Sequence, residues 1–194
     1  HNWIMMKDGK MSKSKGNVVY PEKLINRYGL DAVRYFLLRE MPVSQDGLYT
    51  PEGFVERYNS DLANVLGNLV NRTISMNKKY FDNVVVNSDV TEEVDNLLLE
   101  MVLSAKEKVS KCMEELKVAD AIDEVFNIFK RCNKYIDETT PWTLAKEDTE
   151  RLKTVLFNLL ESIKIIATLL FPVMPETAKK IAEQINVEAL TLEA

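Results

Sequence analysis

The sequence predicts a mainly α-helical protein, in which an antiparallel helical bundle follows a short strand–loop–helix region. Three observations lead to this fold class. After residue 50, apolar residues recur at three- and four-residue spacing through most of the chain, which is typical of helices with one buried face. The connections between these stretches are short, which favours antiparallel neighbours. Few stretches other than residues 1–6 have the pattern of a strand.

The composition is that of a folded protein with an uneven charge distribution. The chain has 194 residues, of which 46% are hydrophobic, so it can form one large or two small domains with a real core. Its net charge is −5, yet residues 1–40 carry eight Lys/Arg and four Asp/Glu. We therefore expect general contact with phosphate only near the N-terminus, and any RNA contact further along to be local and specific.

The cysteines and the apolar stretches exclude several classes of protein. Cys112 and Cys132 form no CxxC pair and the single histidine is His1, so spacing predicts no zinc site. We expect both cysteines to be reduced, core-facing thiols of a cytoplasmic protein. The longest apolar stretch, 155–174, is interrupted by polar residues, which indicates a core helix and no membrane span. No signal peptide is visible.

The first fifty residues predict short elements around a polar loop. Residues 1–6 are predicted to form a strand that leads into a lysine-rich loop. Pro21 can open a helix that runs through Arg27 and is closed by Gly29 as its C-cap. The next helix is predicted over Leu30–Glu40, followed by a connector over 41–50 that is rich in turn-forming residues.

A long helix is predicted from Pro51 to about Tyr80, with Thr50 as its N-cap. Its apolar stripe contains Phe54, Tyr58, Leu62, Val65, Leu69, Thr73, Met76 and Tyr80. After a break over 82–89, further helices are predicted over 91–116, 119–137, 148–170 and 175–184. The residues predicted to face inward in the first three of these are Val94, Leu98, Met101, Ala105, Cys112, Ile122, Val125, Phe126, Phe129, Cys132, Ile136, Leu152, Val155, Leu156, Leu159, Ile163, Ile166 and Leu170. Thr139-Thr140-Pro141-Trp142 should interrupt the bundle and place Trp142 in a loop between helices.

The lysine-rich loop has the chemistry of a polyphosphate site. Four lysines stand within residues 7–15, opposed only by Asp8, and serines and glycines are mixed among them. Lysine brings a mobile positive charge, glycine lets the backbone approach a ligand, and backbone N–H groups and hydroxyls donate hydrogen bonds. From composition alone, a solvated surface loop is the alternative interpretation.

The order of the letters adds a family resemblance. Lys10-Met11-Ser12-Lys13-Ser14 resembles the ATP-binding signature loop of class I aminoacyl-tRNA synthetases, in which a following Lys-Gly-Asn is also usual. Further landmarks resemble the C-terminal half of methionyl-tRNA synthetases, and they cover almost the whole chain: 32–40, 58–64, 66–72, Pro141-Trp142 and 144–146. Leucyl, valyl, isoleucyl and cysteinyl enzymes share the loop and a helical bundle, whereas the Asn-Leu-x-x-Arg and Pro-Trp motifs resemble the methionyl type.

The resemblance implies an ATP loop. Lys13 would be the main catalytic, ATP-binding lysine, because charge builds on the phosphates during amino-acid activation. Lys10, assigned as a second catalytic lysine, and Ser12 and Ser14 would bind ATP and shape the mobile loop as it closes. ATP would bind with Mg²⁺ and methionine in the full enzyme, and zinc is expected only in an N-terminal part that this chain lacks.

The resemblance also implies a tRNA-binding face. Asn68 and Arg72, one helical turn apart, would read the first anticodon base of tRNA(Met), a cytosine, through fixed donors and acceptors. Trp142 would stack on anticodon bases, and Asp137 is a weaker candidate that would repel wrong bases. The alternatives are ordinary polar decoration of a helix edge for Asn68 and Arg72, a core or inter-helix tryptophan for Trp142, and a solvent-facing residue for Asp137.

We therefore predict a piece of a larger enzyme. Residues 1–50 would be the end of a catalytic domain, and residues 51–194 would form the helical anticodon-binding domain. The chain has no His-Ile-Gly-His-type motif and no Gly-rich Rossmann segment, so alone it should not activate methionine. Alternatives are a class I synthetase of another specificity, a non-catalytic helical tRNA-binding module, or an acidic helical interaction protein that never meets RNA.

Overall fold

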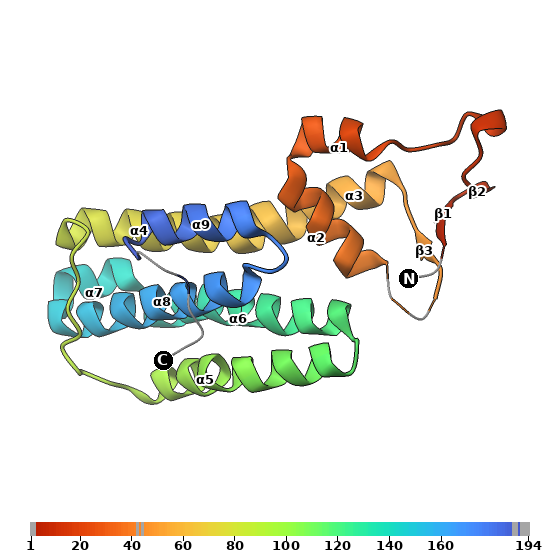
Figure 1. Ribbon diagram of the computed structural model, residues 1–194. Helices are drawn as coiled ribbons and strands as arrows, with labels where there is room; N and C mark the ends of the chain where they lie inside the picture. The colour runs from red at the N-terminus through yellow and green to blue at the C-terminus, as the bar shows by residue number, and fades with distance from the viewer. Residues whose placement is uncertain (1–2, 42, 44, 188–189, 191–194) are drawn as a thin grey trace.

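The computed structural model describes residues 3–41, 43, 45–187 and 190. A small N-terminal region with short strands lies at one end of an elongated bundle of helices (Figure 1). Successive long helices run in opposite directions (Figure 1). The predicted mainly α-helical, antiparallel fold class is confirmed.

The N-terminal region contains a small sheet of order β2-β1-β3. β1 (Ile4–Met6) pairs antiparallel with β2 (Gly9–Lys10) and parallel with β3 (Gly47–Leu48). The predicted N-terminal strand is thus confirmed over residues 4–6, while residues 1 and 2 lie outside the described part. β2 and β3 were predicted as loop and connector, which was wrong. Strands of two residues are too short to show an alternating pattern in the sequence, and only their pairing with β1 identifies them as strands.

Two helices follow the lysine-rich loop as predicted. α1 (Pro21–Tyr28) begins with Pro21 in its first turn and ends at Gly29, which has φ 85° and donates its N–H to the carbonyl oxygen of Ile25. α2 (Leu30–Glu40) has the predicted bounds. Together with β1 and α3 they surround a small core of Ala32, Val33, Phe36, Met41, Tyr49 and Phe54.

The long helix is continuous from Pro51 to Phe81 but is not α-helical throughout. α3 (Pro51–Arg57) starts at Thr50, whose side chain accepts a hydrogen bond from the N–H of Gly53 as an N-cap. A π-helical segment covers Tyr58–Gly67, and α4 (Asn68–Phe81) completes the helix. The wider turn changes which residues face the core: Leu66, Val70 and Asn77 are buried, whereas Tyr58, Leu62, Val65, Met76 and Tyr80 of the predicted stripe are only half-buried. The predicted stripe assumes 3.6 residues per turn, whereas a π-helix has more residues per turn, so the buried face shifts along this segment.

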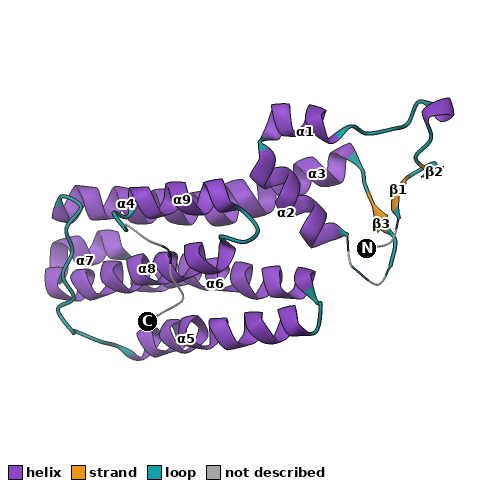
Figure 2. Ribbon diagram, in the orientation of Figure 1, coloured by secondary structure: helices purple, strands orange, loops and turns teal. Residues whose placement is uncertain are grey.

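The remaining helices build the main core. They are α5 (Glu93–Glu114), α6 (Val118–Thr139), α7 (Pro141–Glu147), α8 (Thr149–Leu170) and α9 (Pro175–Gln184) (Figure 2). Every residue predicted to face inward on α6 and α8 is buried. On α5, Leu98 and Ala105 are buried, but Val94, Met101 and Cys112 are only half-buried. α5 packs against α6 and α8 from one side of the bundle, so its inward face is narrow.

Both cysteines of the chain are free thiols. Cys132 is fully buried, and burial raises the pKa of its thiol to about 12. The prediction that Cys112 also faces the core was wrong, because its side chain is half-buried near the end of α5. The described helices include none that is long and apolar enough to cross a membrane.

Candidate functional site

The lysine-rich loop projects from the end of the molecule. β1 and β2 form a hairpin that turns at Lys7 and Asp8, and a 3₁₀ turn over Lys13–Lys15 follows. Gly16 closes that turn with φ 67°, in the left-handed region that glycine adopts without strain. Lys13, Ser14 and Lys15 are all exposed on this turn, whereas the other two predicted ATP-loop residues precede it: Lys10 is exposed in β2 and Ser12 is half-buried at the start of the turn.

The lysines of this loop differ in what surrounds them. The Lys10 Nζ atom lies 4.6 Å from the centre of the Trp3 ring, a cation–π contact. Lys7 lies 3.7 Å from Glu52, and both side chains are highly exposed. Lys13 and Lys15 form no ion pair with any residue that the structure describes. Their charges are therefore free to attract an anionic ligand.

The two serines of the loop contact each other. The Oγ atoms of Ser12 and Ser14 lie 2.7 Å apart, and the backbone N–H of Ser12 donates to the side chain of Asn17 at 2.8 Å. Asp8, the acid that the sequence places among the lysines, hydrogen-bonds Asn17. Sequence reasoning missed this contact, because nothing in the order of letters shows that residues 8 and 17 meet across the loop.

The other predicted site residues lie on the bundle. Asn68 is exposed at the start of α4, and Arg72 follows one turn later. The Arg72 Nη2 atom donates to Asp137 of α6 at 3.0 Å, and 65% of the Asp137 side chain is exposed. The structure thus joins Arg72 to the weaker candidate Asp137 in an ion pair that water can reach.

Trp142 lies where the chain turns from α6 into α7. It was predicted in a loop, which was wrong: Pro141 opens a short helix and Trp142 is in its first turn. Its ring is 48% exposed, so the alternative of a core tryptophan does not hold. The turn depends on Thr140, whose φ of 42° is unusual for a β-branched residue. Such backbone strain is often found at functional sites.

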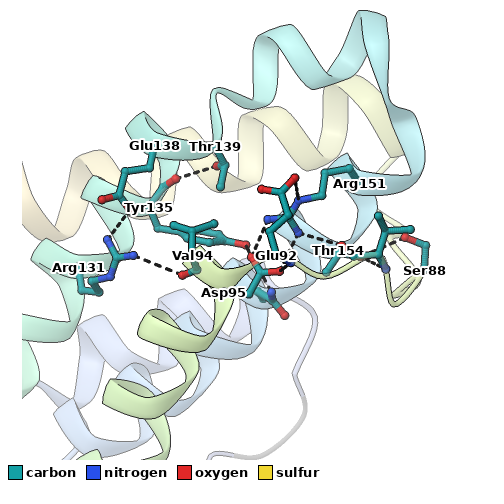
Figure 3. Close-up of polar contacts among 12 residues, drawn as sticks. Ser88, Glu92, Val94, Asp95, Arg131, Tyr135, Glu138, Thr139, Arg151 and Thr154 are labelled. Carbon is teal, nitrogen blue, oxygen red and sulfur yellow. Dashed lines mark hydrogen bonds and ion pairs between the residues drawn. The ribbon is translucent and has the colours of Figure 1, made fainter.

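A buried polar network supports this end of the bundle (Figure 3). The Arg151 guanidinium donates two hydrogen bonds to the Asp95 carboxylate, at 2.7 and 2.8 Å, and both side chains are almost completely buried. The Tyr135 hydroxyl donates to Asp95 at 2.5 Å, and Thr139 donates to the carbonyl oxygen of Tyr135. Burial raises the pKa of Tyr135, which therefore stays a donor. The network joins α5, α6 and α8, and its member Thr139 directly precedes the turn at Thr140 that leads to Trp142.

The lysine-rich loop and α7, which carries Trp142, lie at opposite ends of the molecule, whereas Asn68 lies near the middle of the helix that runs from Pro51 to Phe81. The lysine-rich loop is beyond the start of α3, and α7 lies near the end of α4 (Figure 1). The continuous helix from Pro51 to Phe81 connects these ends, and a helix of that length spans roughly 45 Å.

Comparison with known protein families assigns the chain. Residues 1–74 match the family model described as tRNA synthetases class I (M), and residues 85–193 match the anticodon binding domain of methionyl tRNA ligase. The chain belongs to the methionyl-tRNA synthetase family. The resemblance found in the sequence is thereby confirmed.

Individual members of the methionyl-tRNA synthetase family agree with this assignment. The methionine–tRNA ligase of Clostridium acetobutylicum is 51% identical over the whole chain, and that of Enterococcus faecalis is 53% identical over 99% of it. The chain covers 30% and 29% of these relatives, so it spans about a third of their length. A structure of Mycobacterium tuberculosis methionyl-tRNA synthetase in complex with methionyl-adenylate matches 92% of the chain and 36% of its own length, with a TM-score of 0.88 and 39% identity.

The described residues contain no group of three or more His, Cys, Asp and Glu side chains placed to hold a metal ion. The phosphates of ATP need cationic and hydrogen-bonding groups, and the exposed Lys13 and Lys15 are groups of that kind.

Proposed function

We propose that the full-length protein attaches methionine to tRNA(Met) in an ATP-dependent reaction in the cytoplasm. This chain would supply the ATP loop and the surface that reads the anticodon. The observation that supports the proposal is that the exposed lysine-rich loop and the exposed Trp142 of α7 lie at opposite ends of one molecule in a member of this family. A tRNA is long enough to present its anticodon at one end while its acceptor end lies at the other.

At the first site, Lys13 is the proposed catalytic lysine. During activation, the methionine carboxylate attacks the α-phosphate of ATP, pyrophosphate leaves, and negative charge grows on the phosphate oxygens. An ammonium group that meets this charge stabilises the transition state more than the ground state. Lys13 is exposed and without an ion-pair partner among the described residues, which supports this role. Mg²⁺ bound to ATP would neutralise part of the same charge.

Lys10, Ser12 and Ser14 have supporting roles in this proposal. Lys10 would have to leave the Trp3 ring to reach a phosphate, and its flexible side chain allows that movement. The Ser12 and Ser14 hydroxyls now bond each other, so each could turn toward a phosphate oxygen as the loop closes. Replacing Lys13 with Ala in the full-length enzyme should slow methionine activation while the fold stays intact. An unchanged rate of ATP–pyrophosphate exchange would contradict the loop assignment.

At the second site, Asn68, Arg72 and Trp142 are proposed to bind the anticodon. Arg72 and Asn68 would hydrogen-bond the edge of the first anticodon base, and the exposed Trp142 ring would stack on a neighbouring base. To do so, Arg72 would break its ion pair with Asp137 and hydrogen-bond the base in its place. Because that ion pair is solvent-exposed, breaking it costs little.

Binding of tRNA(Met) to the chain tests the second site. The control ligand is the same tRNA with its anticodon cytosine changed, at the same moderate salt, because phosphate contacts alone depend strongly on salt. We expect a clear preference for the CAU anticodon. Arg72→Ala and Trp142→Ala should each reduce this preference by about 1–3 kcal/mol. Equal binding of both tRNAs would contradict anticodon reading by this chain.

A further inference from the structure

Asn17 follows the 3₁₀ turn of the lysine-rich loop, and its side chain reaches back across the loop. Its Nδ2 atom donates to both carboxylate oxygens of Asp8, each at 3.0 Å, and to the carbonyl oxygen of Lys10 at 3.4 Å. Its Oδ1 atom accepts the backbone N–H of Ser12 at 2.8 Å. The amide nitrogen of Asn17 faces only acceptors and the amide oxygen faces a donor, so these contacts determine which way the side-chain amide is turned.

These hydrogen bonds join parts of the loop that its backbone does not join. Within the turn, the backbone bonds are local, from Lys15 to Ser12 and from Gly16 to Lys13. The Asn17 amide instead connects the base of the turn to Asp8, at the tip of the β1–β2 hairpin. Ser12, which Asn17 holds by its N–H, is the residue from which the turn carrying Lys13 starts. The position of Asn17 therefore determines where Lys13 leaves the hairpin.

The charges in the loop support this interpretation. Asp8 is the single acid among residues 1–17 and stands among four lysines. Both of its carboxylate oxygens nevertheless bond the neutral Asn17 amide. Hydrogen bonds to a charged acceptor are stronger than neutral ones, so the carboxylate ties the tip of the hairpin to the base of the turn while the Lys13 ammonium stays available to a ligand.

We propose that Asp8 and Asn17 form a positioning pair for the ATP loop, which holds Lys13 ready to meet the phosphates of ATP. This inference rests on the function proposed above for the loop. A lysine that is already held in place need not be ordered during the reaction, and this lowers the barrier. Asn17 acts through Ser12 and Lys13, so it is a positioning residue.

Four variants separate this role from a general effect on folding. Asn17→Ala removes every contact of the amide. Asn17→Asp sets two carboxylates against each other, and Asp8→Asn keeps one weaker amide–amide hydrogen bond. In the double variant Asp8→Asn/Asn17→Asp the partners are exchanged: the carboxylate at position 17 accepts from Ser12 and from the amide at position 8. Asn26→Ala is the control, because Asn26 is an exposed asparagine on the neighbouring helix α1.

The assay is methionine-dependent ATP–pyrophosphate exchange by the full-length enzyme, with active enzyme counted by titration of bound adenylate. We expect Asn17→Ala and Asn17→Asp to lower kcat by about tenfold or more, since a hydrogen bond to a charged group is lost. The KM for methionine should stay within about twofold, because the loop does not hold the amino acid. The exchanged double variant should recover most of the rate, and Asn26→Ala should match the wild type.

Two further outcomes decide between the inference and the function on which it rests. If Asn17 acts through Lys13, Asn17→Ala should add little loss in a Lys13→Ala background. A loss of the same size in that background, a wild-type rate for Asn17→Ala, or no recovery in the exchanged variant would each overturn the positioning role. An unimpaired Lys13→Ala enzyme would overturn the proposed function of the loop itself.

Discussion

Asp95 holds the end of the bundle that carries Trp142, and its replacement should destabilise the whole chain. Its carboxylate accepts two hydrogen bonds from Arg151, one from Tyr135 and one from the N–H of Glu92. Asp95 has an exposed fraction of 0% and Arg151 one of 2%. Asp95→Ala would leave a buried guanidinium without its carboxylate, and the Tyr135 hydroxyl would lose the acceptor of its proton while keeping its contact with Asn158.

The magnitude follows from this geometry. Removing one partner of a buried ion pair costs about 3–5 kcal/mol, because the remaining charge stays out of water. The Arg151 contacts with Glu92 at 3.4 Å and with the carbonyl oxygen of Val90 at 3.0 Å remain, so we expect a value near the lower end, about 3 kcal/mol. That is a large fraction of the stability of a domain of this size.

Urea unfolding followed by circular dichroism measures this effect. The matched control is Glu161→Ala, which breaks the exposed pair of Glu161 with Lys164 on the same helix as Arg151. This control should change the free energy of unfolding by less than about 1 kcal/mol. If Asp95→Ala destabilised the chain no more than Glu161→Ala, the central role of the buried network would be refuted.

Three further predictions concern stability and reactivity. Burial raises the pKa of Asp95, but hydrogen bonds from Arg151, Tyr135 and Glu92 outweigh it, so its pKa lies below the ordinary 3.8. The stability that the ionised carboxylate contributes is present above that pH and should be lost as the pH falls through the lowered pKa of the folded chain. Acid unfolding curves measure this loss, and Asp95→Asn should make the free energy of unfolding depend less on pH in this range. The native chain should react with a thiol reagent at the half-buried Cys112 and not at the buried Cys132, whose pKa is raised to about 12; equal labelling rates would contradict this. Thr50→Ala should cost about 1 kcal/mol in urea unfolding by removing the cap of α3, whereas Thr50→Ser should cost less; equal loss in both would argue against the cap.

Helix bounds were largely predictable because they depend on local signals. Pro21, Pro51 and Pro175 each stand in the first turn of a helix, and Gly29 ends α1. The core faces of α6 and α8 also followed from spacing, because both helices are regular α-helices buried along their length. Where local chemistry decides the structure, the sequence was sufficient.

Features set by contacts between distant segments could not be predicted. The π-helical segment at Tyr58–Gly67 contains Asp61, which accepts hydrogen bonds from Tyr35 of α2 and from Arg57. Its Val65 carbonyl accepts from Asn133 of α6 at 3.0 Å. Tyr35 and Asn133, the two distant partners, cannot be identified from the letters around residue 60. Tertiary contacts therefore override the 3.6-residue period on which the predicted stripe was based.

The candidate sites show the same division. The motif letters identified Lys10, Lys13, Asn68, Arg72 and Trp142 as candidates, and their roles remain predictions. The sequence did not show that Asp137 pairs with Arg72, nor that Trp142 stands in the first turn of a helix opened by Pro141. Which side chains pair depends on how the helices are arranged in space, and a sequence motif does not contain that information.

The contacts of α2 determine the order in which the molecule can be completed during synthesis. Arg34 donates to the carbonyl oxygens of Pro172 and Val173, at 2.8 and 2.9 Å, and Asp31 accepts the N–H of Thr177. These partners are separated by 138 to 146 residues. A ribosome adds about 5–20 residues per second, so α2 waits many seconds for its last partners. α2 is therefore synthesised well before the residues that bond Arg34 and Asp31, and these two side chains face water until then.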